Sequence, residues 1–471
     1  MMKEVIHYTT AIFQIGVFIV MVYYLILSLF GIYKKKDEGA KNCPPKKTFA
    51  LLVAAHNEEM VVGKIVESLQ NIEYPKDMYD IFVIADNCTD KTADIARKYG
   101  VNVCERKVPD KRGKGYALEW MFNKIFKMDK AYDAVGIFDA DNLVSKNFLN
   151  EMNYKLLKGY KVVQGYIDSK NPDDSWITES YSISFWTVNR LFQLGRANLG
   201  LSNQIGGTGF CIETTILKEL GWGVTCLADD LEFTSKLVLN GHKVGWAHNA
   251  IVYDEKPLTL KQSWNQRKRW MQGFADVASR FFFKLIKKSI KDRSFTALDC
   301  ALYTIQPLAT LLMGLAAFLT LIQNNNEHGL NIFVINQLFT QNATTKILWQ
   351  VFSISQFLLT PFIMVLENKL SKKMLLVFAL YSLNVVVLSH IYESPTLYQV
   401  IIGNAVYIGI FIIALGIIGR KKSIKLFVWY LLYGIYTLTW IPITIQGILD
   451  KNNKEWSHTK HIRQIGIQDV E

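Results

Sequence analysis

Long apolar runs lie near both ends of the chain, and a mixed apolar and polar pattern fills the middle. Residues 8–33 are almost uninterruptedly apolar and are followed by Lys34-Lys35-Lys36. This run is long enough to cross a bilayer and has no small-residue cleavage site, so we predict a membrane anchor over residues 1–36 rather than a cleaved signal peptide. The lysines favour the cytoplasmic side, which places the middle of the chain inside the cell.

The second half of the chain contains further apolar blocks. They lie at about residues 297–322, 346–366, 374–391, 398–418 and 426–448. Basic clusters at 369–373 and 420–422 mark two cytoplasmic loops. We therefore predict a transmembrane channel region over 295–449, about six spans with the anchor, and a polar tail over 450–471. The last block contains Trp440-Ile441-Pro442, and a re-entrant or interfacial segment there would place the tail inside instead of outside.

The middle of the chain alternates short apolar strands with amphipathic helices. Strands are expected at 48–55, 80–85, 101–104, 134–138, 161–166 and 242–247, and helices at 60–69, 92–99, 113–126, 148–157, 176–199 and 231–240. Apolar strands that alternate with helices predict a parallel sheet covered on both faces. The expected fold class is an α/β, Rossmann-like cytosolic domain over 46–275 joined to an α-helical transmembrane domain.

Between these two parts, residues 276–294 mix aromatic and aliphatic side chains with lysine and arginine. This composition is typical of an amphipathic helix in a membrane interface. The net charge of +12 likewise favours an anionic membrane surface or an anionic substrate. Nucleic acid is not expected as a partner, because no known basic-aromatic motif is present. The six cysteines show no C-x-x-C spacing, which indicates reduced thiols rather than zinc or disulfides.

Two carboxylates directly follow the apolar strand at 134–138, in the segment Phe138-Asp139-Ala140-Asp141-Asn142. The carboxyl ends of parallel strands are where α/β sheets bind ligands. Mg²⁺ or Mn²⁺ is commonly held by one or two carboxylates together with ligand phosphates. We therefore predict a metal site with Asp141 as the main ligand and Asp139 beside it; a polar turn is the alternative.

Other candidate residues lie before and after this pair. Asp86 ends the strand at 80–85, where it suits a base or ribose, or belongs to the cap region of the next helix. Lys114, between two glycines at a helix start, suits an anionic diphosphate or a solvated surface position. The glycine turn at 206–210 allows close approach of the backbone to a ligand.

Taken in order, Asp86, Asp139-Ala140-Asp141, Ala228-Asp229-Asp230 and Gln266-Arg267-Lys268-Arg269-Trp270 resemble the motifs of family 2 inverting glycosyltransferases. The resemblance is closest to their membrane-embedded processive branch, which includes cellulose, mixed-linkage β-glucan, hyaluronan and poly-N-acetylglucosamine synthases. The family pattern is D, D-x-D, a T-E-D-like triplet and Q-x-x-R-W. In this chain Ala228 and Asp229 replace the threonine and glutamate of the triplet.

The resemblance implies a GT-A fold, a UDP-sugar donor, and a role for each matching residue. Asp230 is the general base that removes a proton from the acceptor hydroxyl. The residues implied in donor binding are Asp86, Lys114, Asp139 and Arg269, those on the acceptor side are Gln266, Trp270, Gly207 and Thr208, and the metal ligands are Asp141 and Asp139. Trp270 would stack on an acceptor sugar, although a basic helix with Trp270 as a lipid-interface anchor is the alternative.

The implied function is a processive synthase that extends a β-linked polysaccharide and passes it across the plasma membrane. We favour UDP-glucose and a cellulose-like or mixed-linkage β-glucan, with UDP-N-acetylglucosamine and a poly-N-acetylglucosamine or hyaluronan-type product as the alternative. A non-processive transferase acting on a lipid-linked acceptor and a non-enzymatic channel or scaffold are further hypotheses. Proteins for export or regulation would be separate chains.

Overall fold

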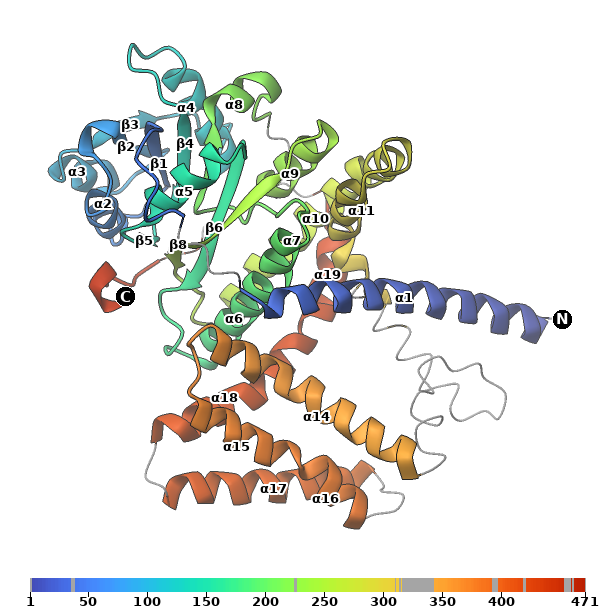
Figure 1. The fold of residues 1–471 in the computed structure, drawn as a ribbon. Coiled ribbons are helices and arrows are strands. Elements are labelled where there is room, and N and C mark those ends of the chain that lie inside the picture. The colour runs from blue at the N-terminus through green and yellow to red at the C-terminus, as the bar shows by residue number, and fades with distance from the viewer. Residues whose placement is uncertain are drawn as a thin grey trace. The chain divides into compact units, whose positions relative to one another are not determined.

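The computed structural model describes residues 2–34, 39–223, 227–309, 311–312, 315, 343–391, 397–417, 421–452, 459 and 461–470. The chain divides into two units (Figure 1). One contains residues 1–26 and 309–441, and the other contains residues 27–308 and 442–471. The second unit holds every residue of the predicted motifs.

An eight-stranded sheet forms the centre of the second unit, in the order β3-β2-β1-β4-β7-β6-β8-β5. The strands are β1 (Phe49–Ala55), β2 (Tyr79–Asp86), β3 (Asn102–Arg106), β4 (Ala134–Asp139), β5 (Leu143–Val144), β6 (Val162–Ser169), β7 (Phe210–Glu213) and β8 (Val244–Asp254). β1 to β4 pair in parallel as predicted, and β6 is parallel to β8. However, β7 is antiparallel to β4 and β6, and β5 is antiparallel to β8. The prediction of a wholly parallel sheet was wrong, because the glycine turn leads into a short strand that runs back along β4.

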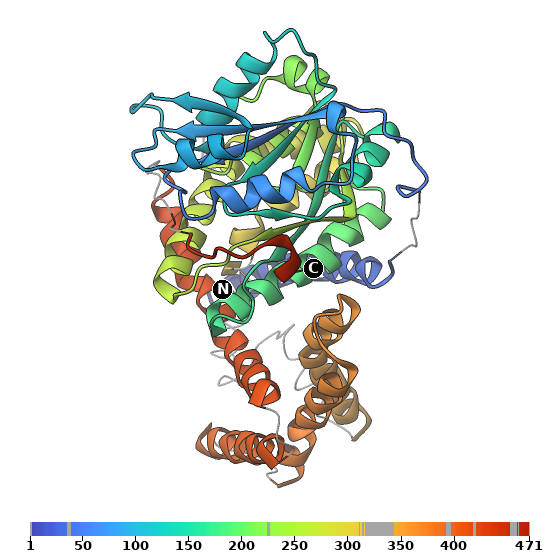
Figure 2. The same ribbon diagram turned by 90° about the vertical axis from the view of Figure 1, so that its left-hand side faces the viewer.

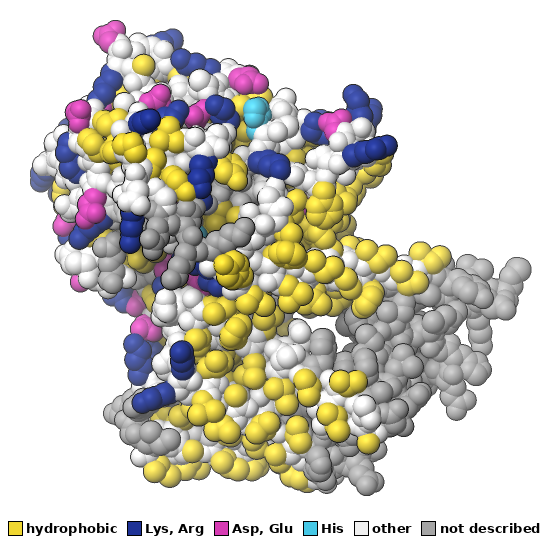
Figure 3. Space-filling view, in the orientation of Figure 1, with side chains coloured by type: hydrophobic (Ala, Val, Ile, Leu, Met, Phe, Trp, Pro, Cys, Tyr) yellow, Lys and Arg dark blue, Asp and Glu magenta, His cyan; other side chains and the backbone are white. Residues whose placement is uncertain are grey.

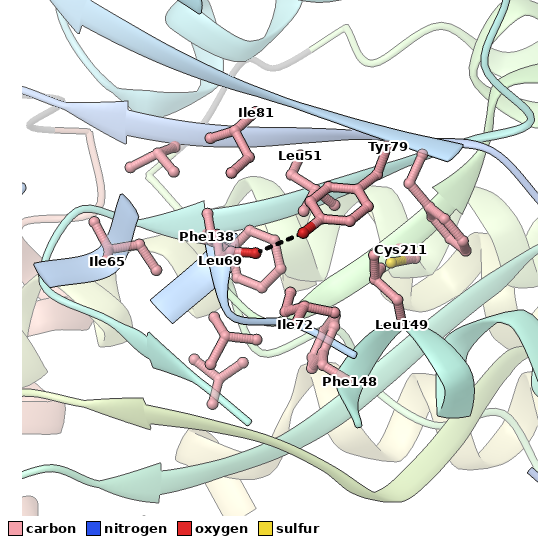
Figure 4. Close-up of a cluster of buried hydrophobic side chains, with 14 of the residues drawn as sticks. Leu51, Ile65, Leu69, Ile72, Tyr79, Ile81, Phe138, Phe148, Leu149 and Cys211 are labelled. Carbon is pink, nitrogen blue, oxygen red and sulfur yellow. Dashed lines mark hydrogen bonds between the residues drawn. The ribbon is translucent and has the colours of Figure 1, made fainter. Parts of the chain in front are cut away.

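Helices cover both faces of the sheet (Figures 1 and 2). They are α2 (Val62–Gln70), α3 (Thr92–Lys98), α4 (Lys114–Ile125), α5 (Phe148–Leu157), α8 (Thr214–Leu220) and α9 (Asp229–Leu239). Alternate residues of β1 point to opposite faces: Leu51 packs with residues of α2 and α5, and Leu52 with residues of α4 and α9. Figure 4 shows the first cluster, where the Tyr79 hydroxyl donates to the Leu69 carbonyl. Both clusters exclude water from beneath the strand ends that carry the motifs.

A continuous helical run and one long helix complete the second unit. The run consists of α6 (Trp176–Thr187), the π-helical turn η2 (Val188–Leu194) and α7 (Gly195–Asn198). Together they confirm the helix predicted at 176–199. The long helix α10 (Leu260–Lys291) joins two segments expected as separate helices, and α11 (Phe295–Thr304) packs against it. Arg190 donates to the carbonyls of Gly31 and Ile32, so the end of α1 (Met2–Ile32) is held by the η2 turn.

The first unit is helical. Its helices are α14 (Ala343–Leu366), α15 (Lys372–Ser382), α16 (Asn384–Ile391), α17 (Leu397–Ile417) and α18 (Lys421–Leu438), and α19 (Trp440–Leu449) leads back into the second unit. Over the described ranges, two segments are long and apolar enough to cross a membrane, Ile15–Ile32 and Lys422–Leu449. Six spans therefore stay a prediction, and residues 316–342, including the end of the block predicted at 297–322, lie outside the described residues.

Side-chain chemistry differs between the units. Hydrophobic side chains gather over α1 and the helices of the first unit, and charged side chains gather over the second (Figure 3). Five cysteines within the described ranges are free thiols, as expected, and Cys226 lies outside these ranges.

Candidate active site

Three of the predicted donor residues, Asp86, Asp139 and Lys114, lie at the carboxyl end of the parallel strands. Asp86 is the last residue of β2 and Asp139 the last of β4, with β1 between these strands. Two strand spacings of about 4.8 Å, together with an offset of two residues along the strands, separate the two positions by about 12 Å, a span suited to a nucleoside diphosphate. Lys114 is the first residue of α4 and Asp229 the first of α9, so both helices begin at this end.

Lys114 is half-buried, and its ammonium is held by two acceptors. Its ammonium donates to the Asp139 carboxylate and, at 2.7 Å, to the Gly207 carbonyl. Burial opposes the charge of this ammonium, but Asp139, Asp229 and Asp230 outweigh it and raise the pKa of Lys114. One cation therefore serves three carboxylates, and an anionic ligand that entered here would meet a charged lysine.

Asp230 lies in the first turn of α9 and faces the glycine turn. Its Oδ1 accepts the Leu231 N–H at 2.8 Å, and its Oδ2 lies 3.4 Å from where a Cβ on Gly207 would be. Burial first, and then the neighbouring Asp229, raise the pKa of Asp230 to about 7, while Lys114 lowers it. A carboxylate that titrates near neutrality is suited to accept a proton from a hydroxyl group.

The glycine turn holds the first aspartate of D-x-D in place. The backbone N–H of Asp139 donates to Asn142 Oδ1 at 3.0 Å and to Thr208 Oγ1 at 3.1 Å. Gln164 fixes the turn itself, because it accepts from the Gly206 N–H and donates to the Thr208 carbonyl. The buried Thr208 hydroxyl also donates to Asn142, so the structure places it against the D-x-D turn rather than in an open acceptor path.

The second aspartate of D-x-D is buried and faces a different set of groups. Asp141 Oδ2 accepts the backbone N–H of Glu255, the residue that follows Asp254, at 2.9 Å. Burial raises the pKa of Asp141 well above its usual range, while Lys256, at 2.9 Å, lowers the pKa of Asp254.

The D-x-D carboxylates could serve as ligands of a divalent metal ion. The described residues contain no group of three or more His, Cys, Asp or Glu side chains arranged around a metal position. The carboxylates of Asp139 and Asp141 nevertheless lie at the end of β4, two residues apart. The oxygen donors suit Mg²⁺ or Mn²⁺ held by few protein ligands, with the rest of the shell supplied by ligand phosphates and water.

Asp86 is engaged by side chains of the neighbouring strand and loop. Its Oδ1 accepts from the buried Arg106 at 2.5 Å and from Asn87 at 2.9 Å. Asp90, rather than Asp86, accepts the Thr92 N–H at the start of α3. The alternative, in which Asp90 caps the helix that begins near Thr92, agrees with this bond, and the role of Asp86 in donor binding stays a prediction.

The Q-x-x-R-W residues meet an aromatic group from α6. Tyr181 donates its hydroxyl to Gln266 Oε1 at 2.7 Å, and the Trp270 ring lies 6.0 Å from the Tyr181 ring and 6.3 Å from that of Phe185. We call Tyr181, Phe185 and Trp270 the aromatic platform. Arg269 is half-buried, and loss of solvation lowers its pKa, although the charges of Asp139, Asp229 and Asp230 oppose that effect.

The C-terminal segment 461–470 also reaches this site, which the prediction of a polar tail missed. His461 Nδ1 lies 2.9 Å from Glu58 Oε1, and the N–H groups of Ile462 and Arg463 donate to the two oxygens of Glu255. Ile467 packs with residues of β5 and β8, and the segment runs beside α2 (Figures 1 and 2). The alternating apolar residues at 465 and 467 were the only hint of this contact in the sequence.

Removal of the C-terminal segment is expected to destabilise the second unit in a pH-dependent way. Burial lowers the pKa of His461, but Asp141, Glu58 and Glu255 outweigh it and raise that pKa from 6.5 to about 10. Because the folded pKa is the higher one, the stabilisation is complete below about pH 6.5 and is lost as the pH rises through about 10.

Truncation after Lys460 should therefore lower the unfolding temperature by several degrees at pH 6, and by less at pH 10. Thermal unfolding of the truncated and full chains at both pH values measures this difference. His461→Gln should reproduce part of the effect, whereas His242→Gln, at a half-buried turn, serves as the control. Equal unfolding temperatures of the truncated and full chains at pH 6 would contradict the assignment.

Known glycosyltransferases resemble this chain in sequence. The sequence profile described as glycosyltransferase-like family 2 matches residues 44–273. The chain is 30% identical over 268 residues to the probable glycosyltransferase YdaM of Bacillus subtilis, covering 54% of this chain and 62% of that protein. It is 30% identical over 249 residues to the β-monoglucosyldiacylglycerol synthase of Synechocystis sp., covering 50% of this chain and 49% of that protein.

A poly-β-1,6-N-acetyl-D-glucosamine synthase of Staphylococcus epidermidis is 27% identical over 244 residues, 50% of this chain and 57% of that protein. The matches thus span about half to three fifths of these relatives. Among solved structures, the mannosyltransferase PcManGT of Pyrobaculum calidifontis, in complex with GDP-Man and Mn²⁺, aligns with a TM-score of 0.50 at 16% identity. That alignment covers 78% of this chain and 98% of the other, and it supports a shared GT-A-like fold.

Proposed function

We propose that this chain, in which residues 44–273 form a family 2 glycosyltransferase domain, transfers a hexose from a UDP-sugar with inversion and builds a β-linked polysaccharide processively. The observation that carries this proposal is the grouping of Lys114 and Asp230 at Gly207: the Lys114 ammonium donates to Asp139 and to the Gly207 carbonyl, and Asp230 Oδ2 faces Gly207. A base beside cations is what an inverting transfer from a diphosphate donor requires.

In the proposed reaction, Asp230 accepts the proton of the acceptor hydroxyl as its oxygen attacks the anomeric carbon. The bond from that carbon to the diphosphate oxygen breaks on the opposite side, and UDP leaves with the bonding electrons. Lys114 and Arg269 stabilise the charge that grows on the diphosphate. Asp141, with Asp139, would hold Mg²⁺ or Mn²⁺, which supplies Lewis-acid stabilisation of the same charge.

The donor base and the acceptor would bind on opposite sides of this centre. Asp86 and the buried Arg106 at the ends of β2 and β3 suit the uridine. The aromatic platform, with Gln266 beside it, presents apolar ring faces suited to stacking with a sugar. Gly207 leaves room above Asp230 for the reacting hydroxyl.

We place the enzyme in the plasma membrane as a multi-pass protein with its catalytic domain in the cytoplasm. The apolar helix α1 and the helices of the first unit support a membrane location. The end of α10 exposes Phe283 by 79% and Ile290 by 75% next to Lys284, Lys287 and Lys291, which suits an interface with anionic lipids. Product export through the helices of the first unit belongs to the same proposal.

A second candidate is transfer of one glucose to a lipid acceptor. The 30% identity to β-monoglucosyldiacylglycerol synthases, compared with 27% for a poly-N-acetylglucosamine synthase, favours it. The two apolar segments Ile15–Ile32 and Lys422–Leu449 suit a diacylglycerol acceptor as well as a polymer. UDP-N-acetylglucosamine is the alternative donor in the processive case.

Product analysis separates these candidates. Purified full-length protein in lipid nanodiscs is incubated with UDP-glucose or UDP-N-acetylglucosamine and Mg²⁺, with and without diacylglycerol. The proposal expects a high-mass polymer from UDP-glucose that β-glucan-specific glycosidases digest. A single glucosyl lipid would favour the second candidate, and no UDP release from any UDP-sugar would refute both.

Metal removal provides a separate prediction. Chelation with EDTA should abolish hexose transfer, and added Mg²⁺ or Mn²⁺ should restore it, because only two carboxylates and the donor phosphates hold the ion. UDP release, measured with a coupled assay after desalting, checks this. Ca²⁺, which prefers more ligands, is the matched control and should restore little activity. Full activity in EDTA would contradict the predicted metal role of Asp141.

A further inference from the structure

A fully buried lysine lies between the D-x-D carboxylates and the aromatic platform. The Lys256 side chain, in the loop after β8, is 1% exposed. Its ammonium is 2.9 Å from Asp254 Oδ2 and 3.5 Å from the centre of the Phe185 ring. A desolvated ammonium held against a carboxylate and an aromatic face interacts strongly with both.

The backbone around Lys256 holds it in this position. The Lys256 N–H donates to Asn171 Oδ1 at 2.7 Å, and the Lys256 carbonyl accepts from Asn171 Nδ2 at 3.0 Å. Asn171 thus binds both sides of the same residue. The ammonium can respond to its two partners only by small shifts between them.

Each partner of Lys256 belongs to a different part of the site. Asp254 precedes Glu255, whose backbone N–H donates to the carboxylate of Asp141, the second aspartate of D-x-D, at 2.9 Å. Phe185 stacks on Tyr181 with ring centres 6.3 Å apart and lies 6.3 Å from Trp270. Lys256 therefore connects the segment that binds Asp141 to the aromatic platform.

We infer that Lys256 is a positioning residue that couples occupancy of the donor site to the affinity of the aromatic platform for a sugar acceptor. The inference rests on the proposed function, which assigns the two parts of the site to donor and acceptor. A ligand that changes the charge around Asp141 and Asp254 changes how strongly Asp254 holds the ammonium. The ammonium then shifts relative to the Phe185 ring, and the packing of Phe185 on Tyr181 and Trp270 changes with it.

Coupling of this kind is measurable without catalysis, because it is reciprocal between the two ligands. The probes are UDP with Mg²⁺ for the donor site and cellohexaose for the platform, titrated into the full-length protein by calorimetry. In the wild type, saturating UDP should change the Kd of cellohexaose by at least about fivefold, within the usual range of allosteric coupling.

The variants distinguish coupling from a merely structural role. Lys256→Met, which keeps the length of the side chain but not its charge, and Phe185→Leu, which keeps the Lys256–Asp254 pair, should each reduce the effect of UDP to less than about twofold. Lys256→Arg, which retains charge and ring contact, should keep it. The double variant should bind cellohexaose like either single variant, because both interrupt one path.

Several results would overturn the inference. They are a wild-type cellohexaose Kd that UDP leaves unchanged, no cellohexaose binding by the wild type, and undiminished coupling in Phe185→Leu. Thermal unfolding is measured for each variant, and Phe185→Leu decides the matter if Lys256→Met does not fold. A protein that binds both probes with coupling but releases no hexose from UDP-sugars would instead refute the proposed function alone.

Discussion

Replacement of Asp230 by asparagine is expected to lower kcat by about 10²–10⁴-fold, the contribution typical of a general base. Asparagine keeps the shape of the side chain and can still accept the Leu231 N–H, so the first turn of α9 should stay in place. UDP affinity should change by less than about threefold, since Lys114 and Arg269, rather than Asp230, are proposed to contact the diphosphate. The expected variant therefore binds donor but does not transfer its sugar.

The pKa of Asp230 also predicts how activity and stability depend on pH. A base must be ionised, and burial raises the pKa of Asp230 to about 7, so kcat/KM of the wild type should rise as the pH increases through about 7 and level off above it. The folded pKa is above the unfolded value near 3.9, so ionisation of this group costs stability increasingly from about pH 4 to 7. Asp230→Asn should consequently unfold at a higher temperature than the wild type at pH 8.

Steady-state UDP release from pH 5.5 to 9, calorimetric UDP titration and thermal unfolding measure these three effects. Asp129→Asn removes an exposed carboxylate and is the matched control, for which all three should equal the wild type. Wild-type transfer by Asp230→Asn would refute the assignment of the base. A loss of UDP binding as large as the loss of activity would instead assign Asp230 to donor binding.

Lys114→Met should have the second-largest effect, a fall in kcat/KM of about 10²–10³-fold, which is typical for removal of one group that stabilises transition-state charge. The variant also leaves Asp139, Asp229 and Asp230 without the cation that they share. Since Lys114 lowers the pKa of Asp230, its removal should raise that pKa. The rise of activity with pH should therefore move to higher pH.

The pH profile of kcat/KM and the Kd of UDP test this variant together. Lys111→Met removes an exposed lysine from the same loop and is the matched control. Lys114→Arg should recover part of the rate, because it restores the charge but not the compact ammonium between Asp139 and Gly207. An unshifted pH profile for Lys114→Met would show that the lysine does not act on Asp230.

The first two predicted motifs lie at the ends of strands, as the sequence pattern predicted. Asp86 and Asp139 end strands β2 and β4, and these strands run parallel. Local apolar patterning therefore sufficed to place Asp86 and Asp139 at strand ends, and their role in donor binding stays a prediction. The sheet was predicted less well: β5 is two residues long and β7 four, too short for a periodic pattern, and both run antiparallel to their neighbours.

The role of Lys114 could not be decided from its neighbours in the chain. Two flanking glycines suit a surface turn as well as a ligand site. Only the approach of the glycine turn, 93 residues later, gives the ammonium its Gly207 partner. The pKa of Asp230 likewise depends on burial beneath that turn and on Asp229 and Lys114, which a sequence motif does not describe.

By itself, the amino-acid sequence determined the class of the fold, the order of the predicted motifs and the strand ends that carry them, because these follow from short-range periodicity and residue type. The tertiary structure alone decided which charges face one another. His461 approaches Glu58 across 403 residues, and Lys256 bridges Asp254 and Phe185 from different elements. Electrostatic interactions depend on distance and burial in space, and neither quantity is encoded in the spacing of residues along the chain.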